Sequence, residues 1–128
     1  DGGAVLGVDT VVALGPEVYG KPPDRDAARA TLERLSGREH RVLSGVCVID
    51  ERVRSAVAVT TVRMRNLDQQ TLNWYLDSDE WKGRAGGYAI QARGAALVKE
   101  IEGEYLNVVG LPVQTLLDLL PDLLRGSA

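Results

Sequence analysis

The stretch Ala4-Val5-Leu6-Gly7-Val8-Asp9-Thr10-Val11-Val12-Ala13-Leu14 decides how this chain folds. Its nearly continuous run of aliphatic and β-branched residues is typical of a strand that is buried on both faces. Such a strand needs neighbours, and no element precedes this one, so we expect its usual neighbour to be missing. Gly15-Pro16 ends the strand with a turn signal.

Outward from this strand, the chain alternates between helical and strand patterns. Asp24 and Asp68 each precede a helical pattern and are good N-cap residues. Asp50-Glu51-Arg52 lies between two strand patterns and fits a hairpin connection. The predicted helices cover 25–36, 69–76 and a last segment that starts at Pro112, presents Leu116, Leu117 and Leu120, and kinks at Pro121; the further strands cover 40–49, 53–65 and about 95–101.

Composition excludes several classes of function. The chain has 128 residues, one domain's worth, and a net charge of −3. This charge argues against duplex DNA and anionic membranes as partners. No apolar run approaches the length of a membrane span, and no signal peptide begins the chain. A single cysteine, Cys47, excludes an internal disulfide, and a single histidine, His40, excludes a multi-histidine metal centre. We therefore expect a cytoplasmic protein.

Asp9 is the first candidate for chemistry. It is a carboxylate within an otherwise apolar strand, and a buried carboxylate is costly unless it is paired, hydrogen-bonded or metal-bound. Ligands in α/β proteins also lie at strand ends. Asp9 is accordingly a general base or a metal ligand, or else a structural carboxylate that bonds nearby amides or an arginine.

Lys21 follows a sequence that resembles a phosphate-binding loop. The stretch from Gly15 to Lys21 matches G-x-x-x-x-G-K, but Pro22 stands where a P-loop needs Ser or Thr for magnesium. We therefore reject a P-loop NTPase. Lys21 lies on a stiff turn between Gly20 and Pro22, where it is either a phosphate contact or an ordinary solvated lysine.

The stretch 81–91 combines cations, glycines and aromatic residues. Lys82 and Arg84 are suited to polyanions, and Gln91 has both a donor and an acceptor for a base edge. The alternative is a mobile surface loop. Further on, Asn107 precedes a predicted helix N-terminus, where it either binds an anion or satisfies the turn.

Five ordered segments together resemble the Maf family of nucleoside triphosphate pyrophosphatases. They are Gly7-Val8-Asp9-Thr10-Val11-Val12, Gly20-Lys21-Pro22, Leu35-Ser36-Gly37, Ala85-Gly86-Gly87-Tyr88-Ala89-Ile90-Gln91 and the run from Ile101 to Pro112. The resemblance implies an α/β fold with an elongated mixed β-sheet flanked by helices, and a homodimer. It implies hydrolysis of dTTP or UTP to the monophosphate and pyrophosphate with a divalent cation (Mg, Mn or Co).

The resemblance also assigns roles to residues of this chain. Asp9 is the expected proton acceptor and metal ligand, and Lys21 lies near the phosphates. Thr10 and Gln91 mark the branch that prefers dTTP and UTP. Arg84 stands where the family usually has lysine, so a bidentate group replaces a point charge.

One family feature is not in this sequence. Members normally begin with a strand and an S-x-S-P-R-R loop that brings a serine and arginines to the phosphates, and neither is present in residues 1–128. The chain is therefore expected to be a single Maf-like domain without this segment, as a fragment, a processed product or a degenerate member. The rival function is a non-catalytic domain that binds nucleotides, forms dimers or takes part in cell division.

Overall fold

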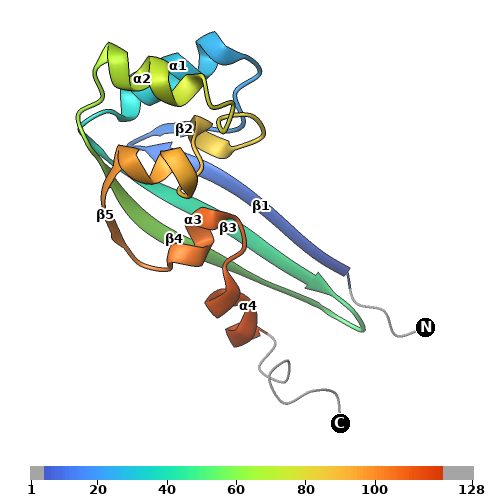
Figure 1. Cartoon of the computed structure of the whole chain (residues 1–128). Coiled ribbons are helices and arrows are strands. Elements are labelled where there is room, and N and C mark those ends of the chain that lie inside the picture. Colours follow the sequence, from blue (N-terminus) through green and yellow to red (C-terminus); the bar gives the residue numbers. More distant parts are fainter. Residues whose placement is uncertain (1–4, 120–128) are drawn as a thin grey trace.

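The computed structural model describes residues 5–119, which form one five-stranded sheet with helices packed against it (Figure 1). The strand order is β2-β1-β3-β4-β5, and every pairing is antiparallel. The strands are β1 (Val5–Leu14), β2 (Glu17–Tyr19), β3 (Glu39–Ile49), β4 (Val53–Met64) and β5 (Val98–Glu102). The helices are α1 (Arg25–Leu35), α2 (Gln69–Leu76), α3 (Tyr105–Val109) and α4 (Val113–Leu119), with 3-10 turns η1 (Ala85–Gly87) and η2 (Ala92–Leu97).

The long hairpin of β3 and β4 forms the central part of the sheet. Its register pairs His40 with Val62 and Ile49 with Val53, so the connection at 50–52 lies at the tip, as predicted. The expected alternation in β4 is confirmed, because Ala58, Thr60, Val62 and Met64 are all buried on one face.

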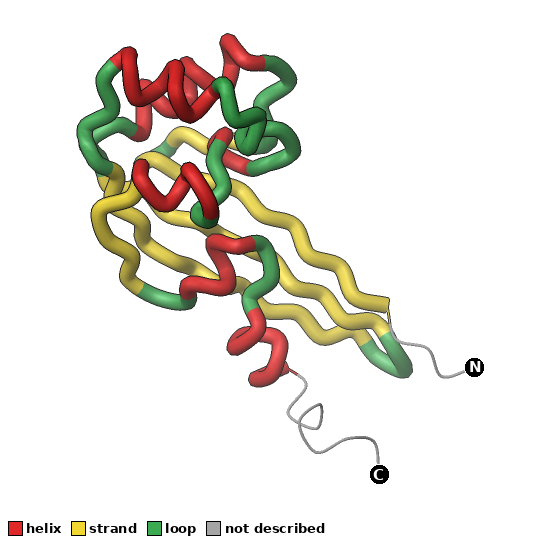
Figure 2. Tube along the Cα trace, in the orientation of Figure 1, coloured by secondary structure: helices red, strands yellow, loops and turns green. Residues whose placement is uncertain are grey.

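The helices pack against one face of the sheet, with α1 and α2 at the end away from the hairpin tip (Figure 2). The core forms there, where Leu32 and Leu35 of α1 and Leu72 of α2 pack against Val12 and Val62. Both predicted N-caps are confirmed: Asp24 accepts a hydrogen bond from the Ala27 amide at 2.8 Å, and Asp68 accepts one from the Thr71 amide at 2.7 Å.

The opposite face of the sheet is bare within residues 5–119. It exposes apolar side chains on three strands, with Val5 of β1 62% exposed, Ile49 of β3 45% and Val57 of β4 65%. The expectation that the first strand is buried on both faces is therefore wrong for this part of the chain. β1 also pairs with β2 only over Val12–Leu14, which leaves the edge at Val5–Val11 open among the described residues.

Several details differ from the sequence expectations. The resemblance implied a mixed sheet, but the pairings in the described part are antiparallel. The short β2 and α3 were not predicted, and η2 covers the first residues of the expected strand at 95–101. The last helix begins at Val113, and its expected kink, with Leu120 and Pro121, lies outside the described residues. No described helix has both the length and the apolar character that crossing a membrane requires.

Candidate active site

A cavity of about 230 Å³ lies where β1 meets the helical end of the sheet. It is bordered by three segments that are far apart in the sequence: β1, the turn after β2, and the loop after α2, with the end of α3 completing it. The lining residues with polar or charged side chains are Asp9, Thr10, Lys21, Arg84 and Tyr88. The structure thus brings together four of the residues singled out from the sequence: Asp9, Thr10, Lys21 and Arg84.

Asp9 lies on the open edge of β1, and its side chain is exposed. The expectation of a carboxylate sunk among aliphatic neighbours is wrong, because the strand has no partner on this side within the described residues. Asp9 borders both the cavity and a second, shallow trough on the bare face, where it lies beside Gly45 and Val57. A carboxylate at such an edge keeps its hydration and is free to meet a ligand.

Thr10 has the opposite orientation to Asp9, because successive side chains on a strand alternate. It pairs with Ser44 across the sheet, and the two hydroxyl oxygens are 2.8 Å apart. Ser44 is fully buried. The pair fixes the Thr10 hydroxyl at the inner wall of the cavity.

Lys21 and Arg84 approach the cavity on two loops that are joined by a backbone hydrogen bond. The Gly86 amide donates to the Gly20 carbonyl at 3.1 Å. Gly86 has a φ of 74°, and a Cβ at this position would lie 2.7 Å from Cγ2 of Val12. Glycine is therefore required for this loop to pack directly against β1. The contact brings two exposed cations to the lining of the cavity that Asp9 also borders.

Tyr88 forms part of the cavity wall, and its hydroxyl contacts a buried histidine. Its hydroxyl lies 2.6 Å from Nε2 of His40, which is 1% exposed. Burial lowers the pKa of His40 to about 4 and raises the pKa of Tyr88 well above its ordinary value. Both groups are therefore neutral near pH 7, and His40 has a structural role as the buried partner of Tyr88.

The remaining predicted site residues lie away from the cavity lining. Lys82 is 3.6 Å from the Asp79 carboxylate and lies over the Trp81 ring, and Gln91 is exposed at the start of η2. Asn107 is fully buried, and its Nδ2 donates to the Val42 carbonyl at 3.0 Å and to Oγ1 of Thr60 at 3.1 Å. The placement of Asn107 at an anion-binding helix start is corrected: it joins α3 to the sheet.

A divalent cation fits this site only together with a ligand. Within residues 5–119 no three Asp, Glu, His or Cys side chains come together as a metal site. The cavity offers one carboxylate, Asp9, and one hydroxyl, Thr10, beside two cations. Magnesium is often held by one or two carboxylates plus substrate phosphates, so this donor set is compatible with a cation that arrives with a polyphosphate.

Sequence reasoning missed two features of the site. The Ser44 partner of Thr10 was not visible, because it depends on the register of β1 against β3. The wall formed by Val108, Val109 and Gly110 was missed because the short α3 has no clear periodic signal in the sequence. Tyr88 lay within a quoted motif, although its hydroxyl partner could not be foreseen.

Comparisons with known proteins identify relatives of this chain. A family model described as "Maf-like protein" matches residues 1–123. A dTTP/UTP pyrophosphatase of Pyrococcus furiosus is 41% identical over 117 residues, covering 91% of this chain and 62% of the relative. One of Roseobacter denitrificans is 47% identical over 117 residues, with 91% and 62% covered. One of Clostridioides difficile is 46% identical over 120 residues, with 91% and 61% covered.

The chain spans about three fifths of the length of these curated relatives. The family model, in contrast, covers nearly all of the chain, and the quoted motifs at Asp9, Lys21 and Arg84 meet at one cavity. From this match and these identities, the chain belongs to the Maf-like protein family.

Proposed function

We propose that the protein carrying this chain hydrolyses dTTP and UTP to the monophosphate and pyrophosphate. The observation that carries the proposal is the meeting of one exposed carboxylate, Asp9, with two cations, Lys21 and Arg84, around one cavity. The relatives in Pyrococcus furiosus and Roseobacter denitrificans, named dTTP/UTP pyrophosphatase, support the choice of substrate.

In the proposed reaction, Asp9 accepts a proton from the attacking water. The water oxygen forms a bond to phosphorus, the phosphoanhydride between the α and β phosphates breaks, and pyrophosphate leaves with the bond's electron pair. Lys21 and Arg84 stabilise the negative charge that develops on the phosphate oxygens. A positioned cation or base of this kind is typically worth a factor of ~10² or more in rate.

The proposal includes a divalent cation held by Asp9 and the substrate's own phosphates. Its chemistry, when bound, is neutralisation of charge on the phosphate oxygens. The Thr10 hydroxyl, fixed by Ser44, orients a ligand at the inner wall of the cavity. We assign base selection to Thr10 and Gln91 and leave Lys82 and Asn107 out of the proposed machinery, because each is engaged elsewhere. The single cysteine and the charge of −3 support a cytoplasmic location.

We also propose that the protein forms a homodimer. The bare face of the sheet supports this, because it presents Val53, Val57 and Val59 to solvent, and contiguous exposed apolar side chains mark interaction surfaces. The second copy is the occupant that the family resemblance implies.

Product analysis tests the proposed function. The protein, with any coding sequence that precedes Asp1, is incubated with dTTP, UTP or dGTP and with magnesium, manganese or cobalt, and the products are separated by ion exchange. We expect dTMP and UMP, each with one equivalent of pyrophosphate, and much slower turnover of dGTP. Release of inorganic phosphate with dTDP would contradict the proposal. Calorimetric binding of dTTP without any product would favour the rival, a non-catalytic nucleotide-binding domain.

A further inference from the structure

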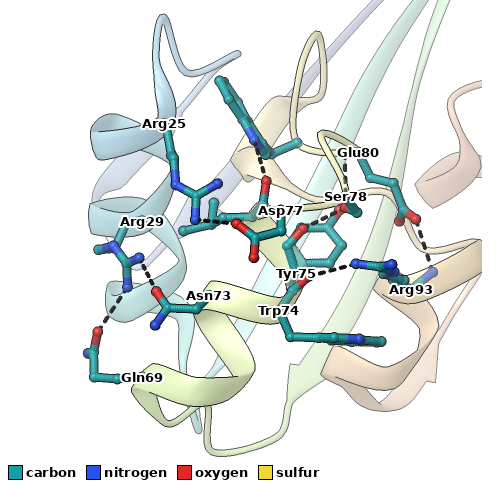
Figure 3. Close-up of polar contacts among 12 residues, drawn as sticks. Arg25, Arg29, Gln69, Asn73, Trp74, Tyr75, Asp77, Ser78, Glu80 and Arg93 are labelled. Atoms are coloured by element: carbon teal, nitrogen blue, oxygen red, sulfur yellow. Dashed lines mark hydrogen bonds and ion pairs between the residues drawn. The ribbon is translucent and has the colours of Figure 1, made fainter.

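Glu80 closes the loop that carries the cationic wall of the cavity. Its two carboxylate oxygens lie at the start of the loop and accept hydrogen bonds from backbone amides at its end. Oε2 accepts from the Arg93 amide at 3.2 Å, and Oε1 accepts from the Gly94 amide at 3.1 Å. Figure 3 shows the Glu80 side chain reaching toward Arg93 beside the residues of α2. The segment between these contacts contains Arg84, Tyr88 and Gln91.

The residue just before the two bonded amides has an unfavourable backbone conformation. Ala92 has a φ of 52°, in the left-handed region where a side chain with a Cβ is strained. Such residues persist only when the surrounding structure over-determines them. The hydrogen bonds from Arg93 and Gly94 to one half-buried carboxylate provide that constraint.

Other contacts hold the same turn against α2. The hydroxyl of Tyr75 accepts from the Ala89 amide at 2.8 Å, and Nη1 of Arg93 donates to the Trp74 carbonyl at 2.9 Å. A Cβ on Gly94 would lie 1.4 Å from the Ala89 carbonyl oxygen, so the two backbone stretches are in close contact. These contacts fix the backbone conformation of the turn at 89–94. The direction of Gln91, which lies within this turn, depends on that conformation.

We propose that Glu80 is a positioning residue for the nucleotide site. By bonding the Arg93 and Gly94 amides it holds Ala92 in its left-handed conformation, and so fixes Gln91 and the loop that presents Arg84. This inference rests on the proposed function, because Arg84 and Gln91 matter here as contacts to a nucleotide. Glu80 itself does not line the cavity.

Amide hydrogen exchange tests the contact without any substrate. In the unliganded protein, Glu80→Gln leaves only one acceptor oxygen for two amides, and we expect exchange across 91–97 to accelerate by ~10-fold or more. Asp79→Asn is the matched control: it removes a neighbouring carboxylate that bonds only the exposed Lys82 among the described residues, at a left-handed position that asparagine tolerates. Unchanged exchange in Glu80→Gln would overturn the inference.

Calorimetry with dTTP separates positioning from plain stabilisation. We expect Glu80→Gln to weaken dTTP binding by ~10-fold and Asp79→Asn to leave it unchanged. Adding Ala92→Gly to Glu80→Gln should restore most of that affinity, because glycine adopts a positive φ without help. Ala92→Gly alone should change the affinity little, because the carboxylate already holds the turn.

The outcomes separate this inference from the proposed function. If the unmodified protein binds dTTP and Glu80→Gln binds it equally well despite faster exchange, Glu80 is structural only and the inference fails. Lost affinity that Ala92→Gly does not restore would also contradict it. If the unmodified protein binds no dTTP, the proposed function fails, and the role of Glu80 at a nucleotide site falls with it.

Discussion

Asp9 and Thr10 are adjacent in the sequence and do different things in the structure. Asp9 is exposed at the open edge of β1, whereas the Thr10 hydroxyl is held by the buried Ser44 on the helical side. A single strand therefore supplies both a solvated carboxylate and a fixed hydroxyl to one cavity. The proposed hydrolysis therefore depends on the alternation of side chains along β1, which sends Asp9 and Thr10 to opposite faces of the strand.

Arg84 stands where the family resemblance implies a lysine, and replacing it tests its contact with the phosphates. We expect Arg84→Ala to weaken dTTP binding by ~10-fold or more, because a charge-assisted contact to phosphate is lost. Arg84→Lys should recover part of the affinity, since the charge returns without the bidentate geometry. Calorimetry at constant salt measures both. Equal affinities for all three proteins would show that Arg84 does not touch the phosphates.

His40 makes stability depend on pH. Its pKa is lowered by burial from 6.5 to about 4 in the folded protein, so between these values the unfolded chain binds more protons. Stability is therefore full above about pH 6.5 and falls as the pH drops toward 4. Between pH 7 and pH 5 we expect a loss of about 2 kcal/mol in the free energy of unfolding from this group.

Urea unfolding at the two pH values measures this loss. His40→Gln supplies the comparison, because glutamine retains a hydrogen-bonding group for Tyr88 and does not titrate. The variant should show a smaller loss between pH 7 and pH 5 than the original protein, and an identical loss in both would contradict the account.

The sequence anticipated most of the residues at the cavity, but it misjudged their surroundings. Asp9, Lys21 and Arg84 were chosen because a carboxylate in an apolar strand and cations in short motifs suggest chemistry on a phosphate, and Thr10 was chosen because the family resemblance marks it. The exposure of Asp9 was not predicted, since burial depends on which strands flank β1. Asn107 was misplaced because nothing local shows that α3 lies against Thr60.

At the scale of the element, long periodic patterns were predictive and short elements were not. The bounds of α1, α2, β3 and β4 agree with the predicted ranges within a residue or so. Each has a cap or an alternating face that identifies it locally. β2 has three residues and α3 has five, too few for a period to be visible, and both form because β1 and the sheet offer partners.

The loop from Trp81 to Gly94 provides a prediction at this scale. Gly94→Ala places a Cβ against the Ala89 carbonyl oxygen, a backbone atom that cannot turn aside. We expect a loss of ~2 kcal/mol or more in the free energy of unfolding. Gly20→Ala is the matched control, because no atom lies within 4 Å of its Cβ and its change should stay within about 0.5 kcal/mol. Denaturant titration compares them, and similar losses would mean that this turn is not tightly packed.

At the scale of the whole molecule, the sheet has one covered face and one bare face. Helices and loops are confined to the covered side, while Val57 and Val59 remain exposed on the other. If this face joins two copies, Val57→Lys with Val59→Lys should shift sedimentation equilibrium toward the monomer. Leu106→Lys, on the helical side and 42% exposed, should not. A dimer that is insensitive to both charges on the bare face would contradict this arrangement.

The proposed hydrolysis depends most on Asp9 acting as the proton acceptor beside a bound triphosphate. The direct measurement is kcat for pyrophosphate release from dTTP, with the dissociation constant of dTTP determined in parallel, for Asp9→Asn and for Asp26→Asn on the exposed side of α1. We predict that Asp9→Asn lowers kcat by ~10² or more, and that Asp26→Asn changes neither kcat nor the affinity for dTTP. Undiminished turnover in Asp9→Asn would contradict the account.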